Sequence, residues 1–95
     1  MAASIEDITI NYEENDVLIV KELDKEVLTK GAWTTIIFKY QQWEAPKEAY
    51  SPIRFTIRRY RKIRGQYMQQ SKFNISSMDQ AKKIIEALER WIDEE

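Results

Sequence analysis

Residues 53–64 read Ile53-Arg-Phe-Thr-Ile-Arg-Arg-Tyr-Arg-Lys-Ile-Arg64, and this stretch decides the fold class of the chain. Its first half alternates apolar with polar side chains: Ile53, Phe55 and Ile57 are interleaved with Arg54, Thr56 and Arg58. Successive side chains of a β-strand point to opposite faces, so the alternation predicts a strand with one apolar and one cationic face. Gly65 comes next and allows a tight turn into a neighbouring strand.

Other stretches on both sides of this strand have the patterns of regular elements. Strands are predicted over residues 8–12, 17–20, 33–43 and 67–75. The strand over 33–43 places Ala32, Thr34, Ile36, Phe38 and Tyr40 on one face and Trp33, Thr35, Ile37, Lys39 and Gln41 on the other. Residues 44–52 hold both prolines and are predicted to be a polar connection.

The C-terminal part has the pattern of an amphipathic helix. Ser77 with Gln80 three residues later fits a capping box at a helix start. Apolar residues then recur at helical spacing on one stripe: Met78, Ala81, Ile84, Ile85, Leu88, Trp91 and Ile92.

Together these elements predict an α+β fold, an antiparallel sheet of four to five strands followed by one C-terminal amphipathic helix that closes off the sheet. Residues 1–95 are expected to form one domain, with an N-terminal hairpin extension over 1–26, the sheet over 27–76 and the helix over 77–95. A helix about 10 Å across covers about two strands spaced about 4.8 Å apart. We therefore expect a homodimer, with Ile84, Leu88 and Trp91 at its interface.

The composition argues against several classes of function. The chain has no Cys and no His, so thiol and imidazole catalysis and a structural zinc site are excluded. Its two glycines do not form a phosphate-binding loop. We predict a protein that is not an enzyme and holds neither metal nor cofactor. Residues 1–7 have neither a basic start nor an apolar core, and no apolar run approaches about 20 residues, so we expect an intracellular protein without a membrane span.

The charge is distributed unevenly along the chain. Net charge is −1, but residues 1–26 carry −6 and residues 47–76 carry +7. Six of the eleven residues in 54–64 are cationic and none is acidic. Such segregation indicates a surface directed at an anionic partner.

The cationic stretch is also interleaved with aromatic rings. Strand phase places Arg54, Arg58, Lys62 and Arg64 on one face with Tyr60, and Arg61 belongs to the same stretch. Guanidinium groups bind phosphates, and rings stack on unpaired bases. The pattern predicts a surface for single-stranded DNA or RNA, in a protein with an accessory role in transcription or replication.

An alternative explanation stays open for the same residues. The basic strand could pair with the acids of residues 1–26, or it could dock an acidic partner as a protein–protein interaction module. Among the aromatic residues, Phe38, Phe55, Phe73 and Trp91 are predicted to be core. The pattern does not decide between core and contact for Trp33, Trp43, Tyr60 and Tyr67.

Three segments resemble a known family. Phe55-Thr-Ile-Arg-Arg-Tyr60, then Lys72-Phe-Asn-Ile-Ser76 with its helix, and Leu28-Thr-Lys-Gly-Ala-Trp-Thr-Thr-Ile-Ile37 are similar to the single-stranded-DNA-binding transcriptional coactivators of the positive cofactor four type. The resemblance covers about residues 27–92 and implies a curved four-stranded sheet, helices at a dimer interface and a strand channel for single-stranded DNA. It implies that Arg58 and Lys72 contact phosphate and that Lys30 lies on the first strand of that channel.

Two positions depart from the family pattern. Arg61 stands where the family commonly has Trp, so base stacking there would be lost or taken over by Tyr60 or Trp43. The connection over 44–52 is longer than the family's usual tight hairpin.

Overall fold

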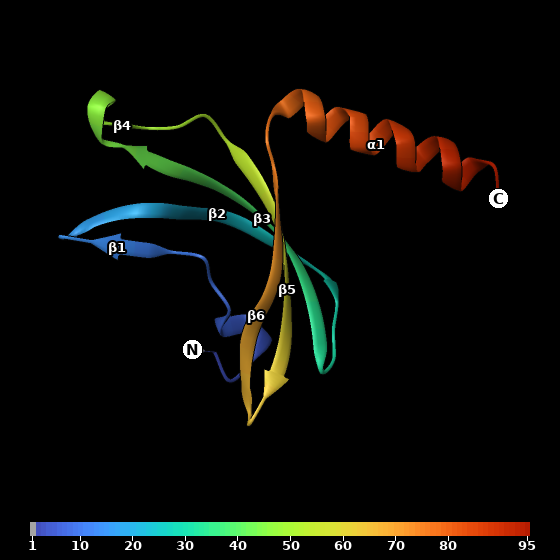
Figure 1. The fold of residues 1–95 in the computed structure, drawn as a ribbon, viewed down its shortest axis with the longest axis horizontal. Helices are drawn as coiled ribbons and strands as arrows, with labels where there is room; N and C mark the ends of the chain where they lie inside the picture. The colour runs from blue at the N-terminus through green and yellow to red at the C-terminus, as the bar shows by residue number, and fades with distance from the viewer. Residues whose placement is uncertain (1) are drawn as a thin grey trace.

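A computed structural model describes residues 2–95 and confirms the α+β class (Figure 1). An antiparallel, curled sheet is followed by one helix, as the sequence predicts. In chain order the elements are a 3-10 turn (Ile5–Asp7), β1 (Tyr12–Glu14), β2 (Val17–Thr29), β3 (Trp33–Glu44), a second 3-10 turn (Ala45–Lys47), β4 (Ala49–Tyr50), β5 (Arg54–Ile63), β6 (Gln66–Ile75) and α1 (Met78–Asp93).

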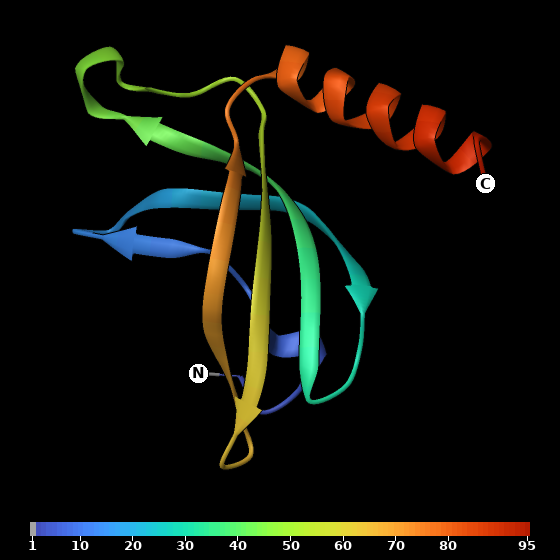
Figure 2. The same ribbon diagram turned by 45° about the vertical axis from the view of Figure 1, so that its right-hand side comes forward.

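The sheet has the strand order β1-β2-β3-β5-β6, and the short β4 pairs with the end of β3. Figure 2 shows β1 and β2 running across the direction of β5 and β6, so the sheet curls strongly. Two bulges in the β2–β3 pairing contribute to this curl, one between Glu22 and Asp24 and one between Val27 and Thr29. An extra residue in one strand bends it and increases the local twist.

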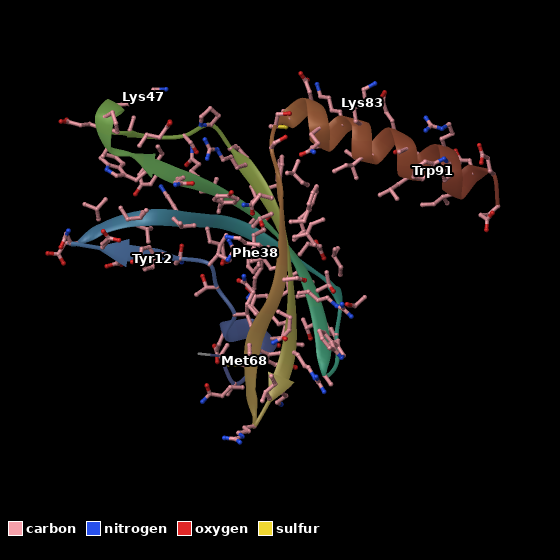
Figure 3. The ribbon with its side chains drawn as sticks, viewed as in Figure 1. Tyr12, Phe38, Lys47, Met68, Lys83 and Trp91 are labelled. Atoms are coloured by element: carbon pink, nitrogen blue, oxygen red, sulfur yellow. The ribbon has the colours of Figure 1, made fainter. Side chains whose placement is uncertain are left out.

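The core lies on the inner, concave face of this curl. Thr34, Ile36, Phe38 and Tyr40 of β3 form its centre, and Thr56 and Tyr60 of β5 continue it. The alternation predicted for 33–43 is therefore confirmed, because every second residue of β3 is buried there. Figure 3 shows Phe38 where the strands cross, inside the curl.

Residues 2–10 cover the inner face from the other side. Ile8 and Ile10 are buried against it, yet they belong to no strand, and β1 begins only at Tyr12. The prediction of a strand over 8–12 is wrong for residues before Tyr12. There, hydrogen bonds to side chains replace the backbone hydrogen bonds to a neighbouring strand. The Glu22 carboxylate accepts from Ile10 N at 3.1 Å, and Asn11 Oδ1 accepts from Glu22 N at 2.8 Å.

The outer face of the same strands is apolar and open. Ile37, Ile57 and Phe73 are direct register partners across β3, β5 and β6. Phe73 is 51% exposed and Phe55 is only half-buried, so neither is the core residue that the pattern predicts. The faces of β5 are reversed with respect to expectation: Thr56 and Tyr60 on its cationic face are buried in the core, whereas Phe55 and Ile57 on its apolar face are only half-buried.

Helix α1 forms where it is predicted but does not cover the sheet. Its N-cap is Ser77, whose Oγ accepts from Gln80 N at 3.0 Å, while Gln80 Oε1 accepts from Ser76 N. The helix leaves the end of β6 and stands away from the strands (Figures 1 and 2). The radius of gyration is accordingly 15.3 Å, against about 12 Å for a compact domain of this length.

Candidate nucleic-acid interface

Strand β5 distributes its cations over both faces of the sheet. Arg58 pairs with Ile36 of β3 and so points to the inner face, as does Arg54 opposite Tyr40. Arg59 and Arg61 pair with Thr35 and Trp33 and lie on the outer face. One sequence stretch thus supplies two separate cationic surfaces.

The first surface is the basic strip, formed by Arg54, Arg58 and Lys72 on the inner side of β5 and β6. Arg58 and Lys72 are direct cross-strand partners, so their charges lie side by side. Lys72 is exposed and Arg58 is half-buried. Two positive charges held together without a carboxylate between them repel each other, and an anion at the strip would relieve that repulsion.

The polar partners of the strip are neutral amides. Arg58 Nη1 donates to Gln69 Oε1 at 3.0 Å, and Arg54 Nη1 lies 3.4 Å from Gln42 Oε1. Arg58 Nε is buried and has no hydrogen-bond partner within the part of the chain that the structure describes. These contacts orient the guanidinium groups and leave their charge unneutralised.

Tyr60 does not present a ring to a base. Its side chain is 6% exposed and packs in the core cluster with Ile8, Ile10 and Ile36. Burial raises the pKa of its phenol, the positive charge of Arg58 lowers it, and the negative charge of Glu22 raises it further. The prediction that Tyr60 lies open beside the cations is wrong, because residues 2–10 cover this end of the inner face.

Other predicted cations gather at the end of the sheet where two hairpins turn. Lys62 belongs to β5, and its backbone N–H donates to Ala32 O at 2.7 Å, which ties the two hairpins together. Its ammonium lies 5.6 Å from the centroid of the Tyr67 ring. Lys62 and Tyr67 thus place a cation and a ring side by side near the sheet end.

Two predicted site residues lie in turns and not on strands. Lys30 follows the end of β2, so the resemblance to a first strand over 28–37 spans a turn here. Arg64 has φ 52° in the turn between β5 and β6, next to Gly65 at φ 79°. Neither shares the strand face of Arg58, and both project at the sheet end.

An exposed stack on the outer face was not predicted. We call Trp33, Arg59 and Arg61 the Trp33 cluster. The guanidinium carbons of Arg59 and Arg61 lie 4.1 Å and 5.3 Å from the Trp33 ring centroid. Trp33 is 41% exposed. Alternation along β5 places Arg59 and Arg61 on one face, but only the β3–β5 register brings Trp33 between them, and a single sequence does not contain that register.

The contacts of the β5 cations bear on the alternative in which they pair with N-terminal acids. Within residues 2–95 their hydrogen bonds and ring contacts go to neutral groups: Gln42, Gln69, Trp33 and Tyr67. The N-terminal Glu22 is engaged elsewhere, since its carboxylate accepts from Thr9 Oγ1 at 2.7 Å as well as from Ile10 N. The cations are therefore available to a ligand.

The residues predicted for a dimer interface lie on the free helix. Leu88 is 51% and Trp91 57% exposed, whereas Ile84 is half-buried. Figure 3 shows Trp91 near the far end of α1, clear of the sheet. Within residues 2–95 the main contact of α1 is with β6.

Comparisons with known proteins add no assignment. No protein-family model matches the chain, and neither a curated protein nor a solved structure matches it. Within residues 2–95 the structure contains no helix long and apolar enough to cross a membrane.

Proposed function

We propose that this chain is a non-enzymatic, single-stranded nucleic-acid-binding protein that acts as a homodimer. The observation that carries the proposal is the cross-strand pair of Arg58 and Lys72, two cations from different strands with neutral polar neighbours. The sequence resemblance to single-stranded-DNA-binding coactivators implies phosphate contacts at these same two positions. The pairing of Arg58 with Lys72 in the sheet supports the same phosphate contacts, and it is observed independently of the resemblance.

A single strand suits this surface better than a duplex does. The cations lie along extended strands, and the exposed ring of Trp33 and the half-buried ring of Tyr67 lie near them. Unpaired bases can stack on such rings, whereas the bases of a duplex are already paired and stacked on each other. Duplex reading commonly uses a helix in the major groove, but Met78–Asp93 carries four acidic and three basic side chains and has no cationic face for that purpose.

A second copy of the chain is the proposed cover for the remaining apolar surface. In one chain Phe73, Leu88 and Trp91 are exposed, and Ile37 and Ile57, which form the outer-face row with Phe73, are only half-buried. A symmetric pair would cover both at once, because each helix can lie on the partner's sheet or helix. Exposed apolar surface of this extent marks an interaction site.

The test measures affinity and its salt dependence by fluorescence anisotropy with labelled oligo-dT and a matched duplex. If Arg54, Arg58, Lys62 and Lys72 neutralise about four phosphates, log affinity falls with log salt at a slope of about −3. Lys72→Ala should flatten the slope by about 0.7. Lys47→Ala is the matched control, since it removes the same charge from the 3-10 turn Ala45–Lys47, which is not part of the basic strip, and it should leave the slope unchanged.

Two results would contradict the proposal. One is equal affinity for duplex and single strand, and the other is no binding to either at about 50 mM salt. Binding of the wild-type protein to an acidic polypeptide in place of oligo-dT would favour the protein–protein interaction module.

A further inference from the structure

The Trp33 cluster lies on the face of the sheet opposite the basic strip. Trp33 and Arg61 are register partners across β3 and β5, and Arg59 is the diagonal neighbour. Both guanidinium groups lie over one indole ring, which remains 41% exposed. No carboxylate takes part in the contacts that the structure gives these three residues.

The geometry of the cluster fits a nucleotide. A guanidinium stacked on indole gains cation–π energy and is held flat, while its N–H edge stays free to donate to phosphate oxygens. An exposed indole and a flat guanidinium are both surfaces on which a base stacks without regard to its identity. Packing alone explains why one arginine covers a tryptophan, but it does not require two arginines around a partly exposed ring.

Cations also connect the two faces around the end of the sheet. Lys62 with Tyr67 lies towards the inner face, and Arg64 stands in the turn between β5 and β6. Lys30 stands in the neighbouring turn between β2 and β3. A strand of nucleic acid leaving the basic strip at Lys72 would meet these residues before it reached Trp33.

We propose that the Trp33 cluster is a second contact point for single-stranded nucleic acid, reached by a strand that passes around the hairpin end of the sheet. Trp33 with Arg59 stacks a base, and Arg61 donates to the adjacent phosphate. This inference rests on the proposed function and adds a second face to it. A short oligonucleotide occupies the basic strip alone, and a longer one occupies both faces.

The experiment compares oligo-dT of about 5 and about 20 nucleotides, which brackets the span of one to two binding units. Trp33→Ala should weaken binding of the long oligonucleotide about 5- to 150-fold, the measured range for loss of one stacked base. It should leave binding of the short one unchanged. Arg61→Gln should reduce the salt slope of the long oligonucleotide by about 0.7 without affecting the short one.

The controls separate this inference from the proposed function and from misfolding. Lys72→Ala should weaken both lengths, because the basic strip serves both. Arg61→Gln changes an exposed side chain, so its binding can still test the Trp33 cluster if Trp33→Ala fails to fold. A second readout is the emission of Trp33 in a Trp43→Phe/Trp91→Phe background, which the long oligonucleotide should quench and the short one should not.

Three outcomes would overturn the inference. If wild-type protein binds both lengths and Trp33→Ala and Arg61→Gln change neither, the inference fails while the proposed function stands. If an acidic peptide such as poly-glutamate quenches Trp33 as strongly as the long oligonucleotide, the cluster is a protein contact. If wild-type protein binds no single strand at all, both proposals fail.

Discussion

Lys25 holds the N-terminal segment against the core, and its removal is the sharpest test of the observed packing. Its Nζ donates to three backbone carbonyls: Ile8 O at 2.7 Å, Glu6 O at 3.0 Å and Ile5 O at 3.2 Å. Lys25→Met keeps most of the aliphatic stem and removes the ammonium group. The residues it holds include Ile8, whose side chain is 3% exposed and closes the inner face.

The expected cost follows from these three contacts. Hydrogen bonds to charged groups contribute about 1.5–3 kcal/mol each. The hydrogen bonds to Ile5 O and Ile8 O are part-buried and contribute to the free energy of unfolding, whereas the bond to Glu6 O is exposed and contributes little. Two such bonds give about 3–6 kcal/mol. Lys25 itself is half-buried, so we take the lower part of this range and expect a loss of about 3–4 kcal/mol. That is a large fraction of the about 5–15 kcal/mol typical of a domain.

Urea unfolding followed by tryptophan fluorescence measures this loss. Lys21→Met is the matched control, because it removes the same charge from the same strand and loses only a contact of 5.1 Å to the Tyr50 ring centroid. Lys21 and Tyr50 are only half-buried, and a cation–π contact near the surface contributes about 0.5–1 kcal/mol. Hydrogen exchange of the Tyr67 amide adds a local readout, since that amide donates to Ala2 O at 2.8 Å.

Two results would refute this reasoning. Equal losses for Lys25→Met and Lys21→Met would show that the three carbonyl contacts stabilise nothing beyond an ordinary surface lysine. Faster exchange at Tyr67 with unchanged global stability would show that residues 2–10 undock independently and are not part of the cooperative core.

Three other outcomes are expected. Phe38→Ala should lower the free energy of unfolding by about 3–5 kcal/mol at any protein concentration, because Phe38 is fully buried. Phe73→Ala should instead abolish the concentration dependence of the melting temperature that a dimer shows. Trp91→Glu should sediment as a monomer, and wild-type protein that is itself monomeric at high concentration would contradict the homodimer. Burial raises the pKa of Tyr60 above 10.0. An unfolded tyrosine ionises first, so stability is retained below about pH 10 and lost as pH rises through the folded pKa. Tyr60→Phe should remove that alkaline loss in urea unfolding.

Local patterns predicted the elements that depend on near neighbours. The alternation of β3 and β5, the turn at Gly65 and the Ser77 cap are each set within a few residues, and the structure contains all of them. Strand β2 was only partly predicted. Its bulges shift the side-chain phase twice, so its sequence does not alternate over its whole length.

The residues of the candidate site were predicted better than their arrangement. Alternation paired Arg54 and Arg58 on one face correctly, and the β5–β6 register adds Lys72 to them. The exposure of the Tyr60 side chain was predicted wrongly because residues 2–10, which cover it, lie about fifty positions away in the sequence. Periodicity shows that a strand has two different faces, but the identity of the covered face depends on such distant segments.

The same cause explains why the cationic surface proposed to bind nucleic acid is divided between two faces. β3 carries apolar groups on both faces, and within residues 2–10 Ile8 and Ile10 pack on the inner one. Covering it buries Tyr60 and leaves Arg58 and Lys72 open at the β6 side, so the inner surface is a narrow strip. The outer face keeps its apolar row near α1, where a second chain is the proposed cover, and its cations near Trp33. Only the Trp33 cluster, with Lys62 and Tyr67, therefore lies at the hairpin end of the sheet, whereas Arg58 and Lys72 are paired on the rung next to the Ile57–Phe73 pair of the apolar row, on the opposite face.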